Sequence, residues 1–148
     1  MSDLRAVIDV GTNSIKFHVA KRMDDGTLGT VVDENDIARL GEGLRETGLI
    51  APEPLERNAQ SVAAFVARAR SLGAEHPEIV GTMALRTAKN ADAFIARVKE
   101  LSGATLRVIG GEEEARISYL AVMSGLPVGD GELVTFDTGG GSTEFVYG

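Results

Sequence analysis

The chain has 148 residues, of which 43% are hydrophobic, with a formal net charge of -7 and no cysteine. This length allows one large domain or a domain with part of another, and the lack of cysteine excludes disulfides and thiol chemistry. The acidic balance argues against general nucleic-acid binding, which draws its affinity from a basic surface. Because no apolar run approaches the roughly 20 residues that span a bilayer and no signal peptide is visible, we expect a cytoplasmic protein without a membrane partner.

The first part of the chain is predicted to form strands. Residues 5–10 and 14–21 form two strands joined by a tight turn, because apolar and polar residues alternate in the second with the period of a half-buried strand. An Asp-Gly pair at 25–26 is a hairpin signal before a third strand at 28–33. Residues 41–54 are rich in glycine and proline and are predicted to be a loop.

Helices and strands alternate in the remainder. Apolar residues at helical spacing, the closing Gly73, the candidate N-cap Asn90 and the helix-ending pair Gly125 and Pro127 set the boundaries. The predicted elements are a helix at 55–72, a strand at 78–82, a helix at 90–101, a strand at 105–109, a helix at 112–124 and a strand pair from residue 133. This order predicts an α/β fold with a mixed central sheet and flanking helices. The weakest point, and so the predicted domain boundary, is 127–131.

One short pattern occurs twice. Residues 9–17 and 137–145 both follow the pattern D-x-G-x-x-S-x-x-F, and each follows a short apolar run. An ordinary hairpin explains the first copy equally well. The second copy has three consecutive glycines, whose entropic cost a merely structural turn does not require. The backbone N–H groups of such turns suit phosphate oxygens, and the leading aspartate can hold a cation. The repeat therefore predicts two turns that hold a polyphosphate from both sides.

Two further groups of residues could take part in phosphate chemistry. The glutamates at 112–114 begin a predicted helix, where acidic residues complement the helix dipole. One of them could instead accept a proton from an attacking water, and the pattern does not say which. Arg86 follows a predicted buried strand, where a loop could hold it over the sheet edge. It is either a surface arginine or a phosphate ligand, a role to which its forked guanidinium is suited.

Four stretches resemble, in order, motifs of the exopolyphosphatase / guanosine pentaphosphate phosphohydrolase family, which belongs to the superfamily of actin, sugar kinases and the large heat-shock chaperones. They are residues 8–14, 81–90, 109–116 and 136–144. The sugar kinases and actins share the two turns but differ around 109–116. The resemblance implies an actin-like (ribonuclease H-like) domain over 1–126 and, over 127–148, the first hairpin of a second, truncated domain of the same kind.

The resemblance also implies roles for individual residues. It assigns activation of the attacking water to Glu114, with Glu144 aligning the water, and it assigns a divalent cation, Mg²⁺ or Mn²⁺, to Asp9, Asp137 and Glu144. Phosphate binding falls to Arg86 and to the residues of the two turns, Gly11, Thr12, Asn13, Ser14, Gly139, Gly140, Gly141 and Ser142. Thr12 and Thr138 stand where the family often has serine and an aliphatic residue, and neither change removes a required group.

The activity that the resemblance implies is hydrolysis of terminal phosphoanhydride bonds. The substrate would be inorganic polyphosphate, the 5′-triphosphate of guanosine pentaphosphate, or both. Two alternatives stay open, namely an ATP-dependent kinase or ATPase of the same superfamily and a non-catalytic domain that binds polyphosphate. We expect the chain to be the N-terminal part of a longer protein, a homodimer in its full-length form, and to hydrolyse little by itself.

Overall fold

A mixed sheet of five strands forms the centre of the molecule. The computed structural model describes residues 4–126 and 131–148. The strand order is β3 (Leu28–Asp36), β2 (Ile15–Arg22), β1 (Leu4–Val10), β4 (Glu78–Gly81) and β5 (Leu106–Val108). The first three strands form an antiparallel meander, whereas β4 and β5 run parallel to β1. The predicted α/β fold with a mixed sheet is therefore confirmed.

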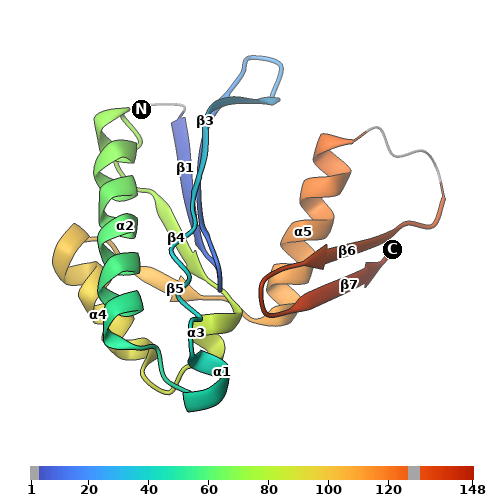
Figure 1. The fold of residues 1–148 in the computed structure, drawn as a ribbon. Helices are drawn as coiled ribbons and strands as arrows, with labels where there is room; N and C mark the ends of the chain where they lie inside the picture. Colours follow the sequence, from blue (N-terminus) through green and yellow to red (C-terminus); the bar gives the residue numbers. More distant parts are fainter. Residues whose placement is uncertain (1–3, 127–130) are drawn as a thin grey trace.

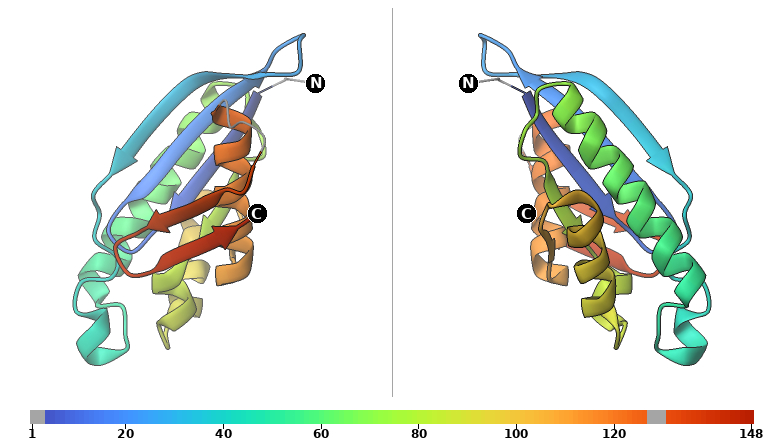
Figure 2. Two further views of the ribbon diagram at one scale, coloured as in Figure 1. Left: turned by 90° about the vertical axis from the view of Figure 1, so that its right-hand side faces the viewer. Right: turned by 90° about the vertical axis from the view of Figure 1, so that its left-hand side faces the viewer.

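The two faces of this sheet are covered differently. Helices α2 (Pro52–Ser71) and α4 (Ala91–Ser102) lie on one side, and α5 (Gly111–Gly125) lies on the other (Figure 1). Strands β6 (Val134–Thr138) and β7 (Thr143–Tyr147) form a separate antiparallel hairpin. The hairpin lies on the same side of the sheet as α5, away from α2 (Figure 2). The candidate site lies at the ends of β1 and β4, beside α5 and the turn of the hairpin.

The core lies between the sheet and the helices α2 and α4. Alternate residues of β1 and β2 point into it, and so does one stripe of each helix, as the spacing predicts. Ile8, Phe17, Val62, Val66 and Phe94 are fully buried there, and the ring of Phe17 also stacks on Phe65 with 4.9 Å between the ring centroids. Each such side chain contributes about 1.5–3 kcal/mol through burial, so this layer holds β1 and β2 in place.

The prediction of a loop over residues 41–54 is wrong in part. This segment contains a short helix, α1 (Leu44–Thr47), which lies between Gly43 and Gly48, both in the left-handed region. Helix α2 then begins inside the predicted loop, at Pro52. Proline in a first helical turn loses no hydrogen bond, because the first N–H groups have no partner within the helix. Glycine and proline here begin and end helices, whereas the prediction took them as signs of a loop.

Two other local predictions also need correction. Residues 83–87 form a short helix, α3 (Met83–Thr87), so Arg86 lies on a helix and not on the expected loop. Asn90 does precede α4, but its side chain caps no helical N–H. Its Oδ1 accepts the N–H of Ile50 at 2.9 Å and its Nδ2 donates to the Ile50 carbonyl at 2.9 Å. Asn90 thus fixes the segment before α2.

Helix α5 and the hairpin are much less buried than the rest. No residue of α5 is fully buried, and Phe136 and Phe145 are 69% and 71% exposed although their rings contact each other. Pro127 and most of the predicted boundary at 127–131 lie outside the described residues. Among the helices that the structure describes, none combines the length and apolarity that a membrane span requires.

Candidate functional site

One small cavity gathers almost all of the predicted site residues. It lies where β1 and β4 end, beside the beginning of α5 and the turn of the β6–β7 hairpin. Its volume is about 80 Å³, the space of a few water molecules. The residues that line it are Asp9, Gly11, Thr12, Asn13, Ser14, Lys16, Thr82, Met83, Glu114, Asp137, Gly139, Gly140, Gly141, Ser142 and Glu144.

The two copies of the repeated pattern fold in the same way. In the first turn the N–H of Gly11 donates to the Ser14 carbonyl at 3.0 Å, and in the second the N–H of Gly139 donates to the Ser142 carbonyl at 2.9 Å. Each turn joins two antiparallel strands and follows a strand that carries the leading aspartate. The predicted pair of strand–turn–strand units is therefore present, and both turns face the same cavity.

The two turns also contact each other directly. A Cβ atom on Gly140 would clash with the side-chain amide of Asn13, and one on Gly141 would clash with Met83. A side chain at either position would force Asn13 or Met83 to move, so the two glycines suit the close approach of the second turn to the first. The consecutive glycines therefore bring the two sets of backbone N–H groups to opposite sides of one cavity.

Asp9 is a buried carboxylate with an unused oxygen. Its Oδ1 is buried and has no hydrogen-bond partner among the described residues. Burial raises the pKa of the Asp9 carboxyl, the charge of Lys16 opposes this shift, and the nearby Glu114 and Asp137 add to it. A buried polar atom without a partner is costly, so this oxygen is a place where a cation would be stabilised.

Arg86 connects the two glutamates of the site. Its Nη1 donates to Glu114 Oε2 at 2.6 Å and to the Ile109 carbonyl at 3.0 Å, and its Nη2 lies 3.9 Å from Glu144 Oε1. Alone among the predicted site residues, Arg86 does not line the cavity. It lies behind the two carboxylates, where it fixes their orientation and balances part of their charge.

The carboxylates can contribute to a magnesium site but do not form a complete one. Within residues 4–126 and 131–148, no three side chains of the ligand type converge on one point. Mg²⁺ usually keeps several waters and takes only one or two carboxylates together with substrate phosphates. The unpartnered Asp9 oxygen and Asp137, which accepts a hydrogen bond from Ser118 at 2.9 Å, fit that mode of binding.

Sequence reasoning missed several residues that line the cavities. Lys16 could have been found, because it pairs with Asp9 in the β1–β2 hairpin and so lies beside that carboxylate. Thr82 and Met83 line the cavity from the junction of β4 and α3. Arg45 lines a neighbouring cavity with Gly139, Gly140 and Gly141, and no sequence signal places α1 next to that turn.

The fold and the site together define a class. A sheet of this order, with two glycine turns that face one cavity and carboxylates between them, is that of an actin-like domain. Residues 19–148 match the model of the Ppx/GppA phosphatase family, and the chain belongs to that family. The predicted family resemblance is therefore confirmed.

Individual relatives support this assignment. The chain is 37% identical over its whole length to a guanosine-5′-triphosphate,3′-diphosphate pyrophosphatase of Photobacterium profundum. It is 38% identical over 99% of its length to the protein of the same name in Vibrio vulnificus. In both comparisons the chain spans about 29% of the relative's length.

Solved structures show the same relation. The Aquifex aeolicus PPX-GPPA enzyme matches 98% of the chain and 48% of its own length, with a TM-score of 0.87 and 36% identity. An exopolyphosphatase from Cytophaga hutchinsonii matches 98% of the chain and 46% of its own length, with a TM-score of 0.92 and 30% identity. The actin-like fold is therefore confirmed.

The raised pKa of Asp9 predicts how a neutral substitution changes stability with pH. The folded protein binds the Asp9 proton more tightly than the unfolded chain, so wild-type stability falls as pH rises above 3.8, the ordinary pKa of this group. Asp9→Asn removes this charge and should stabilise the metal-free protein at pH 7. The advantage should disappear below pH 3.8. Urea unfolding at several pH values in chelator measures it, and a variant less stable than the wild type at pH 7 would contradict the prediction.

Proposed function

We propose that the full-length protein carrying this chain hydrolyses terminal phosphoanhydride bonds. Its substrate would be inorganic polyphosphate, the 5′-triphosphate of guanosine pentaphosphate, or both. The observation that carries the proposal is the contact between the two glycine turns around a cavity that also holds Glu114 and Glu144. The names of the relatives in Photobacterium and Cytophaga point to the same substrates.

The size of the cavity supports a terminal phosphate as the reacting group. About 80 Å³ suits one phosphoryl group and a water. Phosphoryl transfer depends mainly on positioning and on stabilisation of charge on the phosphoryl oxygens. Backbone N–H groups of residues 12–14 and 140–142, which follow the internally bonded N–H groups of Gly11 and Gly139, would supply donors on opposite sides of that group.

Glu114 is the proposed general base. It lies in the first turn of α5 and lines the cavity, and the ion pair with Arg86 holds its carboxylate in one orientation. It would accept a proton from the water that attacks the terminal phosphorus. Glu144, whose side chain is only 10% exposed, would align that water from the opposite turn.

A divalent cation would act beside these groups. Asp9 and Asp137 would hold Mg²⁺ or Mn²⁺, with Glu144 beside them. The cation, when bound, would neutralise charge on the phosphate oxygens. The protein's own part is to hold the carboxylates and the phosphates in place. Lys16, which lines the same cavity, would add a positive charge that does not depend on the metal.

The other expectations from the sequence remain predictions. The relatives described above are named as pyrophosphatases and exopolyphosphatases, and this favours hydrolysis over the kinase or ATPase alternative. The chain spans about 29% of its curated relatives, and this supports the prediction that it hydrolyses little by itself. Cytoplasmic location and a homodimer also stay predictions.

The role of Glu114 can be tested with a neighbouring glutamate as control. Glu114→Gln in the full-length protein should lower turnover by roughly 10²–10⁴, the usual loss when a general base is removed. Glu113→Gln should be mild, because Glu113 pairs with Arg107 at 2.7 Å and does not line the cavity. Phosphate release from polyphosphate measures both. Equal losses, or a larger loss for Glu113→Gln, would show that the base is wrongly assigned.

The metal requirement makes a separate prediction. Hydrolysis by the full-length protein should need Mg²⁺ or Mn²⁺ and should cease in excess chelator, because the proposed ligands are hard oxygen atoms. Added Mg²⁺ should restore phosphate release. Undiminished release in chelator, with the metal content of the protein checked by elemental analysis, would exclude the metal role.

A further inference from the structure

The segment 38–42, here called the bracing loop, lies against the first turn, residues 11–14. The N–H of Arg39 donates to the Asn13 carbonyl at 2.8 Å, and the N–H of Gly41 donates to the Thr12 carbonyl at 2.9 Å. A Cβ atom on Gly41 would clash with the side chain of Thr12. The bracing loop and the turn are therefore in direct contact.

These two hydrogen bonds determine where the turn points its own N–H groups. In a trans peptide the carbonyl and the following N–H point in opposite directions. Because the carbonyls of Thr12 and Asn13 point at the bracing loop, the N–H groups of Asn13 and Ser14 point away from it. Asn13 and Ser14 line the cavity, so the loop sets the direction of the donors that would meet a phosphate.

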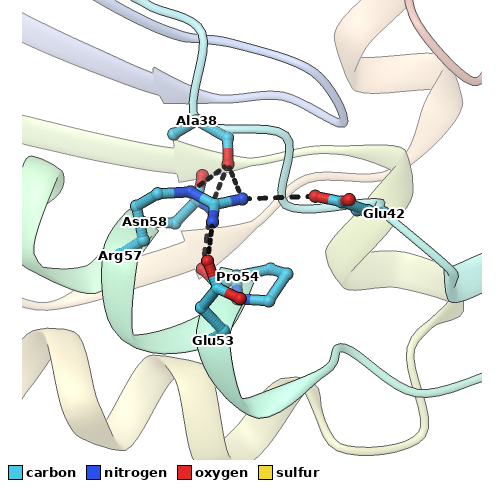
Figure 3. Close-up of polar contacts among 6 residues, drawn as sticks. All are labelled: Ala38, Glu42, Glu53, Pro54, Arg57 and Asn58. Carbon is cyan, nitrogen blue, oxygen red and sulfur yellow. Dashed lines mark hydrogen bonds and ion pairs between the residues drawn. The ribbon is translucent and has the colours of Figure 1, made fainter.

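The bracing loop is held in turn by helix α2. The Ala38 carbonyl accepts three N–H groups, from Arg57 Nε at 3.1 Å, Arg57 Nη2 at 3.0 Å and Asn58 Nδ2 at 2.8 Å (Figure 3). Arg57 Nη2 also lies 3.4 Å from Glu42 at the other end of the loop. Asn58 is 1% exposed and donates its second N–H to the Pro54 carbonyl at 2.7 Å.

The conformation of the loop explains why it needs such support. Arg39 has a φ angle of +50°, in the left-handed region that residues with a side chain rarely adopt. Strain of this kind persists only where the surroundings impose it. The three donors on Ala38, the residue directly before Arg39, supply that constraint. Without them the loop would relax and release the carbonyls of the turn.

We propose that Arg57 and Asn58 are positioning residues for phosphate binding. Although they lie on α2 and do not line the cavity, they fix the Ala38 carbonyl and with it the bracing loop. The loop then aims the N–H groups of the first turn at the substrate phosphate. The identity of the ligand rests on the proposed function, whereas the effect on the turn can be measured without any ligand.

The test compares Arg57 of α2 with an arginine that pairs with α2 from a neighbouring helix. Arg57→Ala removes the contacts with Ala38 and Glu42, and also the ion pair with Glu53 within α2. Arg97→Ala is the matched control, because Arg97 of α4 pairs with Glu56 of α2 at 2.8 Å and its side chain is similarly exposed, at 31% against 39% for Arg57. The ion pairs of Arg97 are with Glu56 and Glu100 and not with the bracing loop. Hydrogen exchange, thermal unfolding and hydrolysis are measured for both variants in the full-length protein.

In Arg57→Ala, the amide protons of Gly41 and Gly11 should exchange about tenfold faster than in the wild type, which corresponds to about 1.4 kcal/mol. They should be unchanged in Arg97→Ala, even where both variants lose similar thermal stability. The KM for polyphosphate should rise about tenfold in Arg57→Ala only, with a smaller change in kcat. Arg57→Lys, which keeps the charge but loses the fork, should lie in between.

Each outcome has one meaning. Equal exchange of the Gly41 and Gly11 amides in the two variants would overturn the proposal, and so would faster exchange with an unchanged KM. If the wild type releases no phosphate from polyphosphate or guanosine pentaphosphate, the proposed function fails. The exchange comparison then decides by itself whether α2 positions the turn. Asn58→Leu, of similar branching, should affect the same amides, but because Asn58 is buried, the Arg57 variants decide.

Discussion

The site depends on one steric constraint, namely that two backbone turns from separate sheets must approach each other with no side chain on residues 140 and 141 of the second turn. Gly140 and Gly141 meet this constraint because any Cβ atom there would clash with Asn13 or Met83. The first turn is placed by the packed sheet and the bracing loop, whereas the second belongs to a hairpin that contacts mainly α5. The cavity therefore exists only while the hairpin keeps its contact with α5.

Charge is the second constraint. Four carboxylates, those of Asp9, Glu114, Asp137 and Glu144, line one cavity in a chain whose net charge is -7. An anionic substrate can enter such a site only if donors and cations outweigh this repulsion. Arg86 balances part of the negative charge of Glu114 and Glu144. The Asp9 oxygen without a hydrogen-bond partner is where a bound cation would neutralise the most negative charge. The need to offset this repulsion also explains why the turns offer backbone N–H groups to the substrate.

Local sequence rules predicted most of the fold but not the contacts that build the site. The strands, the long helices and the two turns follow from periodicity and glycine placement, and the two copies of the repeated pattern line one cavity. The short helices α1 and α3 were missed because glycine and proline serve equally in loops and at helix ends. The pairing of Arg86 with Glu114 and of Arg57 with Ala38 joins residues 28 and 19 positions apart, and no local pattern encodes such contacts.

We expect both turns to bind the same phosphate chain. Titration of the ¹⁵N-labelled 148-residue chain with tripolyphosphate and Mg²⁺, followed by NMR, tests this most directly. The amide signals of Gly11–Ser14 and of Gly139–Ser142 should shift together along one saturation curve, because the two turns line one cavity. Shifts confined to one turn, or found only at exposed basic residues away from the cavity, would contradict the account.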